Sequence, residues 1–362
     1  MLEITLPWRF APIKFPITEW LPEYKWKEWA ANDITAGFTV FIFLIPQGMA
    51  YGLLAGMPPI YGLYSAIVPL YIYAILGTSK QLSLGPMAIT SLLLNVSVKS
   101  YGYEEQSPEY IKLVMNLSLV VGLCILLIGM LKLGSLVNFI SASVLTGFLT
   151  ASALVIFLNQ IKYIFGLGVP RFDYTYQTIV YILSHLGESN ANASALGLAT
   201  FAVLLAVREW KKRNKPTAEN LKSTQYRVLD LLAKLSNLLC IIFGSMIAYF
   251  ITEGGTFIDI VGDVPSGLKA PGFEGVGFTE GIGLIPGALA VAFVAFAGNW
   301  AVAKKYAAEH NYDVDATQEL IAEGLAVTVG AFFNSFAGSG GLSRSAVNAE
   351  SGAITQLATI VV

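Results

Sequence analysis

One arginine stands apart in the C-terminal part of this sequence. Arg344 is the only Lys or Arg between Lys305 and the C-terminus, and it follows the glycine-rich strip 337–341. An ionisable side chain within an apolar span is costly and marks a functional site by default. The chemistry that a lone guanidinium favours there is the binding of a small anion. The alternatives are that Arg344 reaches the membrane surface, or that it pairs with Glu350, for which a spacing of six residues is poor.

Two apolar segments begin abnormally. The first starts with Leu84-Gly-Pro-Met87, where Pro86 suits the first helical position, and the second follows the glycine strip, with Ser343 as a suitable N-cap. Irregular backbone survives at membrane depth only where protein or a water-filled cavity satisfies it. Two broken helices in corresponding halves of a chain therefore predict a midplane site between inverted repeats. Each helix start would direct unpaired N–H groups and a positive dipole end into that site, which favours an anion.

The first long apolar stretch supplies a further candidate. We expect Pro46 to interrupt the helix just before Gln47, so that polar groups there face Arg344. The alternative for Gln47 is an ordinary interhelical hydrogen bond.

Other reactive residue types have simpler interpretations. Asp315 is placed to cap a helix, and Glu319 and Glu323 lie four residues apart in its first turns, where acidic residues suit the helix dipole. We therefore predict neither a hydrolytic site nor a metal site, and no enzyme activity or cofactor. The two histidines lack metal-ligand spacing, and Cys124 and Cys240 lie inside apolar runs as small hydrophobic residues.

Composition identifies the solvent in which these elements fold. The 362 residues are 55% hydrophobic and 13% charged, where a soluble domain carries about 25% charged residues. A net charge of −2 argues against a nucleic-acid partner, which would need a basic surface. The sequence predicts an integral membrane protein with the lipid bilayer as its surroundings and no cleavable signal peptide. Charge-free intervals place about ten spans, at 34–54, 58–78, 84–98, 110–131, 134–158, 194–207, 232–251, 281–303, 318–336 and from 341 onward.

The loops give the orientation. Seven Lys and Arg residues against two Glu lie in 208–227, so this loop is predicted to be cytoplasmic. An even number of spans precedes it, which places the N-terminus in the cytoplasm as well. Lys304 and Lys305 fall on the same side.

Several strings together resemble the SulP (sulfate permease) family. The matching strings are Asp33-Ile-Thr-Ala-Gly37, Ile45-Pro-Gln-Gly-Met-Ala-Tyr51, Pro58-Pro-Ile-Tyr-Gly-Leu-Tyr-Ser65, Leu84-Gly-Pro86, Ser143-Val-Leu-Thr-Gly-Phe148, Tyr312-Asp-Val-Asp315, Gln318-Glu-Leu-Ile321 and Leu342-Ser-Arg-Ser-Ala-Val-Asn348. The resemblance implies an all-α, seven-plus-seven inverted-repeat fold in which a core domain moves against a gate domain, with half-helices as the third and tenth spans. It also implies a homodimer for the full-length protein and a location in the plasma membrane.

The same resemblance divides the chain. It implies a cytoplasmic segment 1–30, core spans one to four in 31–132, gate spans five to seven in 133–252, an extracellular linker 253–280, and core spans eight to ten in 281–362. The anion would lie between the starts of spans three and ten. Carried over by motif, the substrate-binding residues are Gln47, Tyr51, Gly85, Pro86, Met87, Ser343 and Arg344.

Two departures from the family pattern affect the expected function. Gly298 stands where proton-coupled sulfate permeases carry a glutamate, and this favours exchange of sulfate, chloride or bicarbonate by alternating access. The chain also stops near the tenth span, so we expect a fragment or truncated product without the remaining spans and the cytoplasmic STAS domain. The alternatives are a proton-coupled sulfate symporter and a non-transporting module, either a membrane motor or a truncated regulatory partner.

Overall fold

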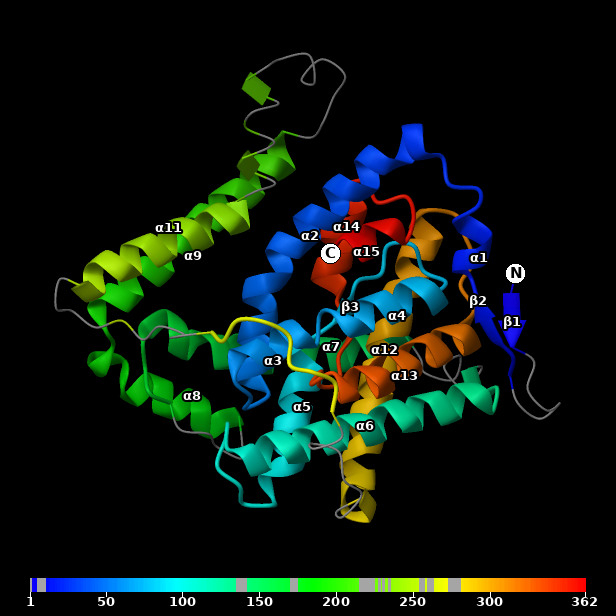
Figure 1. The fold of residues 1–362 in the computed structure, drawn as a ribbon. Coiled ribbons are helices and arrows are strands. Elements are labelled where there is room, and N and C mark those ends of the chain that lie inside the picture. The colour runs from blue at the N-terminus through cyan, green and yellow to red at the C-terminus, as the bar shows by residue number, and fades with distance from the viewer. Residues whose placement is uncertain are drawn as a thin grey trace. The chain divides into compact units, whose positions relative to one another are not determined.

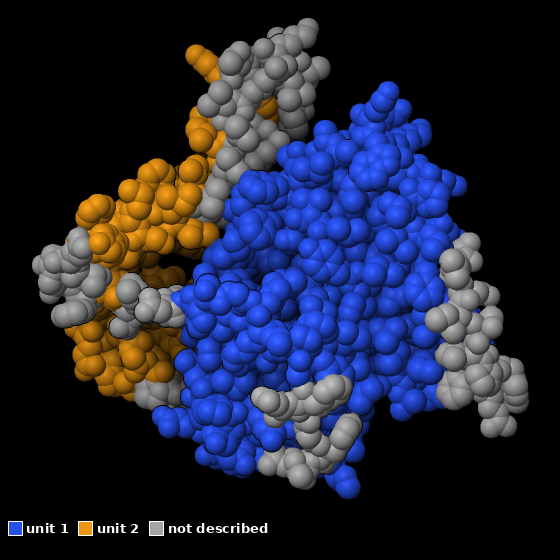
Figure 2. Space-filling view, in the orientation of Figure 1, with its two compact units in different colours: residues 1–145, 263–362 blue, residues 146–262 orange. Residues whose placement is uncertain are grey.

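Helices make up most of this chain, and they group into two compact units. The computed structural model describes residues 2–4, 11–134, 142–169, 175–214, 225–226, 229, 232–233, 236–253, 258, 264–272 and 281–362. Unit 1 comprises Met1–Leu145 and Asp263–Val362, and unit 2 comprises Thr146–Gly262 (Figure 2). The described residues also form two short antiparallel sheets, each of two strands, which the all-α prediction did not include.

The elements follow one another as labelled in Figure 1. Unit 1 begins with β1 (Leu2–Ile4), β2 (Ile13–Phe15), α1 (Ile17–Trp20), α2 (Trp26–Leu54), α3 (Pro59–Tyr64), α4 (Val68–Leu76), β3 (Leu84–Gly85), α5 (Ala88–Lys99) and α6 (Pro108–Met130). Helix α7 (Ala142–Phe165) leads into unit 2, which holds α8 (Thr175–Ser184), the 3-10 helix η2 (Leu186–Glu188), α9 (Ala191–Arg213) and α11 (Ser236–Glu253). Unit 1 then resumes with α12 (Gly281–Glu309), α13 (Ala316–Phe332), β4 (Ser339–Gly340), α14 (Leu342–Glu350) and α15 (Leu357–Val361).

Five helical segments in the described residues are long and apolar enough to cross a bilayer. They are Trp26–Leu54, Pro59–Leu76, Pro108–Met130, Ala191–Arg213 and Ile282–Glu309. The second of these is two helices, α3 and α4, joined at residues 65–67. Ser65 stabilises this junction, because its hydroxyl donates to the Tyr61 carbonyl and accepts the Phe336 backbone N–H at 2.8 Å. The predicted total of ten spans stays a prediction.

Helix α2 corrects one expectation from the sequence. It runs without a break from Trp26 to Leu54 and contains Pro46 in its interior. Proline removes one backbone hydrogen bond, here the one to the Ile42 carbonyl, but a membrane helix tolerates this where neighbouring groups compensate. Gln47 is therefore presented by a continuous helix and not by the end of a broken one.

The C-terminal helices pack on the N-terminal part of unit 1. Both α14 and α15 contact α2, and Figure 1 shows these segments from the two ends of the chain side by side. The contact is close because α2 carries a glycine there: a Cβ built on Gly37 would fall 2.7 Å from the Val361 Cβ. Small residues allow helices to approach closely within a membrane, where van der Waals packing drives association.

Helix α13 packs against α6 in the same way. A Cβ on Gly122 of α6 would lie 2.5 Å from the Thr328 hydroxyl oxygen, and a Cβ on Gly324 of α13 would lie 2.5 Å from the Leu126 nitrogen. These two glycines let the backbones interlock, which buries Leu320 almost completely. The position of α13 is therefore fixed on one face by α6.

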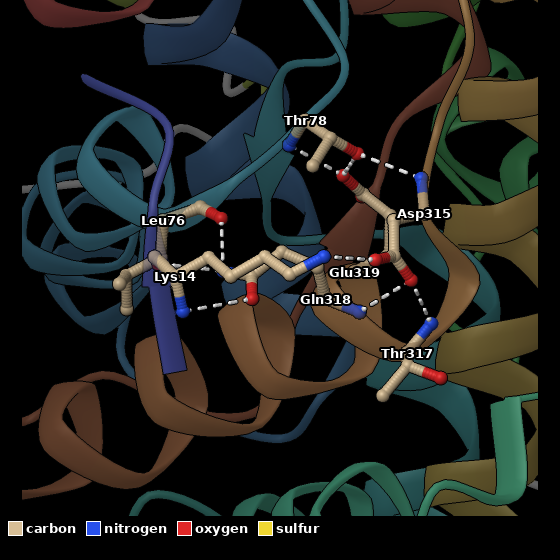
Figure 3. Close-up of polar contacts among 7 residues, drawn as sticks. All are labelled: Lys14, Leu76, Thr78, Asp315, Thr317, Gln318 and Glu319. Carbon is tan, nitrogen blue, oxygen red and sulfur yellow. Dashed lines mark hydrogen bonds and ion pairs between the residues drawn. The ribbon is translucent and has the colours of Figure 1, made fainter. Parts of the chain in front are cut away.

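The start of α13 is tied to the N-terminal strand β2 (Figure 3). Asp315 is the N-cap, as predicted, and its Oδ1 accepts the backbone N–H groups of Thr317 and Gln318 at 3.0 and 3.2 Å. Lys14 Nζ donates to Asp315 Oδ2 at 3.0 Å, and the Lys14 backbone N–H donates to Gln318 Oε1 at 3.2 Å. Gln318 Nε2 donates in turn to the Leu76 carbonyl at 2.7 Å. These bonds hold α13, β2 and the end of α4 together.

Glu319 extends this network into the protein interior. Its carboxylate is completely buried and accepts from both the backbone N–H and the hydroxyl of Thr78 at 2.7 Å (Figure 3). The Tyr73 hydroxyl donates to the same carboxylate at 2.8 Å. The carboxylate also accepts from the Ser79 backbone N–H at 3.2 Å and from Asn299 Nδ2 at 3.3 Å. The position of Glu319 in the first turn predicts only an interaction with the helix dipole. The structure shows that it also orders the loop that leads into β3.

Candidate anion-binding site

The site is built on a sheet of two residues per strand. β3 pairs with β4 so that Leu84 lies opposite Gly340 and Gly85 lies opposite Ser339. The backbones approach so closely at Gly338 that a Cβ there would overlap the Gly85 carbonyl. The pairing satisfies backbone groups that would otherwise be unpaired inside a membrane. The glycine strip is therefore required by the close approach of two non-helical segments.

A helix begins directly after each strand. Helix α5 begins at Ala88 with Met87 as its N-cap, and α14 begins at Leu342 with Gly341 as its N-cap. Two expectations are corrected: Pro86 lies before the helix start, and Ser343 lies in the first turn without acting as the cap. The first turns keep N–H groups that have no intrahelical acceptor, and each carries the positive end of a helix dipole.

Arg344 occupies the junction between the two strands. Its side chain is completely buried, and Nη1 donates to Gln47 Oε1 at 3.0 Å and to the Pro86 carbonyl. Nη2 lies 3.4 Å from the carbonyl oxygens of Ser83 and Ser339, and Nε has no acceptor among the described residues. No carboxylate is among these partners. The guanidinium charge is therefore hydrogen-bonded without being neutralised, and it contributes a positive field to the site.

Gln47 links this arginine to the open side of the site. Its Oε1 accepts from Arg344, which directs its Nε2 toward the Tyr51 and Ser343 hydroxyls at 3.1 and 3.2 Å. Gln47 and Tyr51 are half-buried, whereas Ser343 is exposed. The two hydroxyls accept from the amide and keep their own O–H groups as neutral hydrogen-bond donors next to a buried positive charge.

The opposite wall comes from α12. Gly298 has no side chain, and a Cβ at this position would meet Met87 Cε and Ser339 Oγ at 3.6 Å each, an ordinary contact distance. Met87 itself is half-buried at the start of α5. The structure thus brings together all the residues carried over by motif, which are Gln47, Tyr51, Gly85, Pro86, Met87, Ser343 and Arg344.

Comparison with known proteins identifies the family to which this chain is related. The sequence pattern described as the sulfate permease family matches residues 31–362. This chain belongs to that family. It is 35% identical to sulfate transporter 4.1, chloroplastic, of Arabidopsis thaliana and 33% identical to human prestin, over 96% and 95% of its own length. It spans about half the length of these relatives, 48% and 47%.

A solved structure supports the same relationship. The murine solute carrier 26 family member A9, an anion transporter solved in the inward-facing state, superposes with a TM-score of 0.83 at 25% identity. The match covers 96% of this chain and 57% of that one. This chain is therefore an integral membrane protein of the sulfate permease family, and its relatives named here include a sulfate transporter and an anion transporter.

Sequence reasoning missed some of the residues that meet at this junction. Ser83 and Ser339 accept from Arg344 through backbone carbonyls, which any residue could supply, so no side-chain signal marks them. Asn299 lies directly behind β4, where a Cβ on Gly340 would fall 2.7 Å from its Oδ1. An uncharged asparagine inside a long apolar helix was the one signal that could have indicated this contact.

Proposed function

We propose that this chain holds the anion pocket of a secondary transporter that moves inorganic anions across the membrane by alternating access. The observation that carries the proposal is the meeting of two helix starts over the β3–β4 pair, with the buried Arg344 between them. Oriented N–H groups and a guanidinium that has no carboxylate among its described partners would stabilise a small anion with little reorganisation.

The proposed pocket consists of the residues that face one another at this junction. Gln47 would orient the Tyr51 and Ser343 hydroxyls, which would donate hydrogen bonds to the anion, while Gly85, Pro86 and Met87 would shape the start of α5 beside it. Arg344 already donates to Gln47 and to backbone carbonyls, so its contribution would be mainly the field of its charge. Such a pocket suits sulfate, chloride or bicarbonate, because it is lined with donors and lacks groups specific for one geometry.

Exchange of one anion for another is the transport mode that we propose. Gly298 supplies no carboxylate at the wall formed by α12, which argues against a proton carrier at that position. The segments 31–132 and 281–362 would form the moving core, and 133–252 part of the gate. The protein would lie in the plasma membrane with a cytoplasmic N-terminus and would act as a homodimer in its full-length form.

The test is flux in proteoliposomes that contain the purified protein. Radiolabelled sulfate uptake is measured with chloride, with bicarbonate or with no permeant anion inside the vesicles. Exchange predicts uptake only when an internal anion can leave. Equal uptake into vesicles without an internal anion would exclude exchange, and the absence of both binding and flux for all three anions would exclude the pocket itself.

A further inference from the structure

An apolar groove runs between α9 and α11 in unit 2. The two helices contact each other and lie side by side (Figure 1). The groove has a volume of about 660 Å³ and is lined from α9 at helical spacing, from Leu196 through Val203 to Trp210. Phe243 and Ile247 line it from α11. Leu196 and Trp210 are fourteen residues apart, so the groove is about 21 Å long.

The groove is open to the surroundings of the helix pair. Helix α9 is long and apolar enough to cross a bilayer, and the described residues bury only 6% of its apolar stretch. Val203 and Phe243, on opposite walls, are 51% and 56% exposed. Such side chains face hydrocarbon when the helix spans the membrane. Any acyl chain packs against them equally well, so the apolar walls alone select no particular lipid.

Aromatic side chains mark one end of the groove. The rings of Trp210 and Tyr226 lie 5.9 Å apart, and the Tyr226 hydroxyl donates to the Asn214 carbonyl at 3.0 Å. Trp and Tyr gather where the bilayer meets water, with the ring beside the headgroups. Helix α9 ends at Arg213, directly beyond this level. The last turn of α9 therefore lies at the depth of the lipid headgroups.

Two basic residues flank the groove in that last turn. Lys211 follows Val207 by four positions, and Arg213 follows Trp210 by three. Val207 and Trp210 both line the groove, and helical residues three or four apart are neighbours on one face. Lys211 and Arg213 therefore lie on either side of the groove where it reaches the headgroup level.

The other two basic residues of this helix end do not share that position. Arg208 and Lys212 are each two residues from Trp210, a spacing that puts them on the other side of the helix. Arg213 Nε donates to Glu209 at 2.9 Å, but both side chains are largely exposed. An ion pair of this kind contributes little, so Arg213 is available to a second anionic group.

We propose that this groove is a binding site for an anionic phospholipid, with an acyl chain between α9 and α11 and the headgroup between Lys211 and Arg213. One leaflet holds about 15 Å of hydrocarbon, so a chain fits along the groove from the Trp210 end. The excess of Lys and Arg in 208–227 predicts that this end is cytoplasmic, where anionic lipids concentrate. The inference does not depend on the anion pocket, whose residues belong to unit 1.

Native mass spectrometry of the purified protein in detergent tests this proposal. The protein is titrated with phosphatidylglycerol and, separately, with phosphatidylcholine that has the same acyl chains. The wild type is expected to bind phosphatidylglycerol more tightly. Lys211→Gln/Arg213→Gln removes two charges that each contribute about fivefold, so it should weaken phosphatidylglycerol binding by about thirtyfold. Binding of phosphatidylcholine should not change, because that lipid carries no net charge.

A matched pair of substitutions separates position from charge. Arg208→Gln/Lys212→Gln removes the same charge from the other side of the same helix end, and it should keep the preference for phosphatidylglycerol. A wild type without this preference would overturn the proposal. So would a preference that persists in Lys211→Gln/Arg213→Gln, or an equal loss in the two double variants, which would indicate a general effect of charge.

Gly244 of α11 tests the apolar part of the site. A Cβ built on Gly244, which lines the groove, would meet no atom within 4 Å, and the same holds for Gly147 of α7, which is not among the lining residues. Gly244→Leu therefore fills the groove without steric conflict and should weaken binding of both lipids, whereas Gly147→Leu should bind them as the wild type does. Unchanged lipid binding by Gly244→Leu would overturn the proposal, and it is the result expected if another protein segment covers the groove.

Discussion

Adding one methyl group next to Arg344 should separate the effect of its position from the effect of its charge. A Cβ at Gly341 would lie 2.7 Å from the Arg344 Cζ and 2.8 and 3.0 Å from its two terminal nitrogens. Optimal contact requires about 3.5–4.0 Å, so in Gly341→Ala the guanidinium must move away by about 1 Å. The bond from Nη1 to Gln47 Oε1, now 3.0 Å, would then exceed hydrogen-bond distance.

The magnitude follows from the bonds that are lost. A hydrogen bond from a charged group contributes about 1.5–3 kcal/mol, and 1.4 kcal/mol corresponds to a tenfold change in affinity. Loss of the bond that orients Gln47 should weaken sulfate binding by about 10- to 100-fold. Overpacking should also lower the free energy of unfolding by about 1–3 kcal/mol. Calorimetric titration with sulfate and thermal unfolding in detergent measure the two effects.

Gly298→Ala is the matched control in the same site. Its new methyl group would meet Met87 and Ser339 at 3.6 Å, an ordinary contact, so affinity and stability should change little. The reasoning is refuted if Gly341→Ala binds sulfate as the wild type does. It is also refuted if the two alanine variants lose affinity equally, because steric contact with Arg344 would then not be the cause.

Four other variants address separate parts of the network. Arg344→Lys keeps the charge but cannot reach both Gln47 and the Pro86 carbonyl, so sulfate affinity should fall by about tenfold or more in the same titration. Gln47→Glu places a carboxylate beside Arg344, and it should abolish sulfate binding while the unfolding temperature is retained. Glu319→Gln replaces one carboxylate oxygen, which accepts hydrogen bonds, with an NH₂ group that faces donors. Five hydrogen bonds are donated to this carboxylate, so the variant should lower the free energy of unfolding by about 3–5 kcal/mol. Burial raises the pKa of the Asp315 carboxyl, but hydrogen bonds from Lys14 and from the N–H groups of Gln318 and Thr317 outweigh it and hold that pKa below its usual value. The folded form then has the lower pKa, so this stabilisation is complete above about pH 4 and is lost as the pH falls through the folded pKa. Asp315→Asn should remove that acid-side loss in thermal unfolding, and its cost at neutral pH should stay under about 1 kcal/mol because the pair is partly exposed.

The sequence predicted which residues meet at the β3–β4 junction better than it predicted the local backbone. Arg344 and the two abnormal helix starts could be recognised because charge and glycine-proline breaks are rare at membrane depth. The helix boundaries at Pro86 and Ser343 were wrong, since the β3–β4 pairing extends the non-helical backbone at one start and a glycine caps the other. Pairing between residues so far apart leaves no local signal.

The acidic residues of α13 illustrate a different limit. Their spacing correctly placed Glu319 and Glu323 on one face of a helix. The spacing could not show that Thr78 and Asn299 donate hydrogen bonds to Glu319. It also could not show that neither oxygen of Glu323 has a hydrogen-bond partner among the described residues. Such an asymmetry depends on which segments pack there, and those segments come from distant parts of the chain.

The β3–β4 pair also has a consequence for how the protein is made. Pro86 and Arg344 are separated by 258 positions, so the first strand enters the membrane long before its partner has been synthesised. Until then the polar backbone of β3 and the start of α5 lack their native partners, a costly condition inside a bilayer. Contacts of such high sequence separation form late and slowly. The pocket should therefore be the last part of unit 1 to mature during biogenesis, and chains stopped before residue 339 should be recognised as unfinished because β3 remains unpaired.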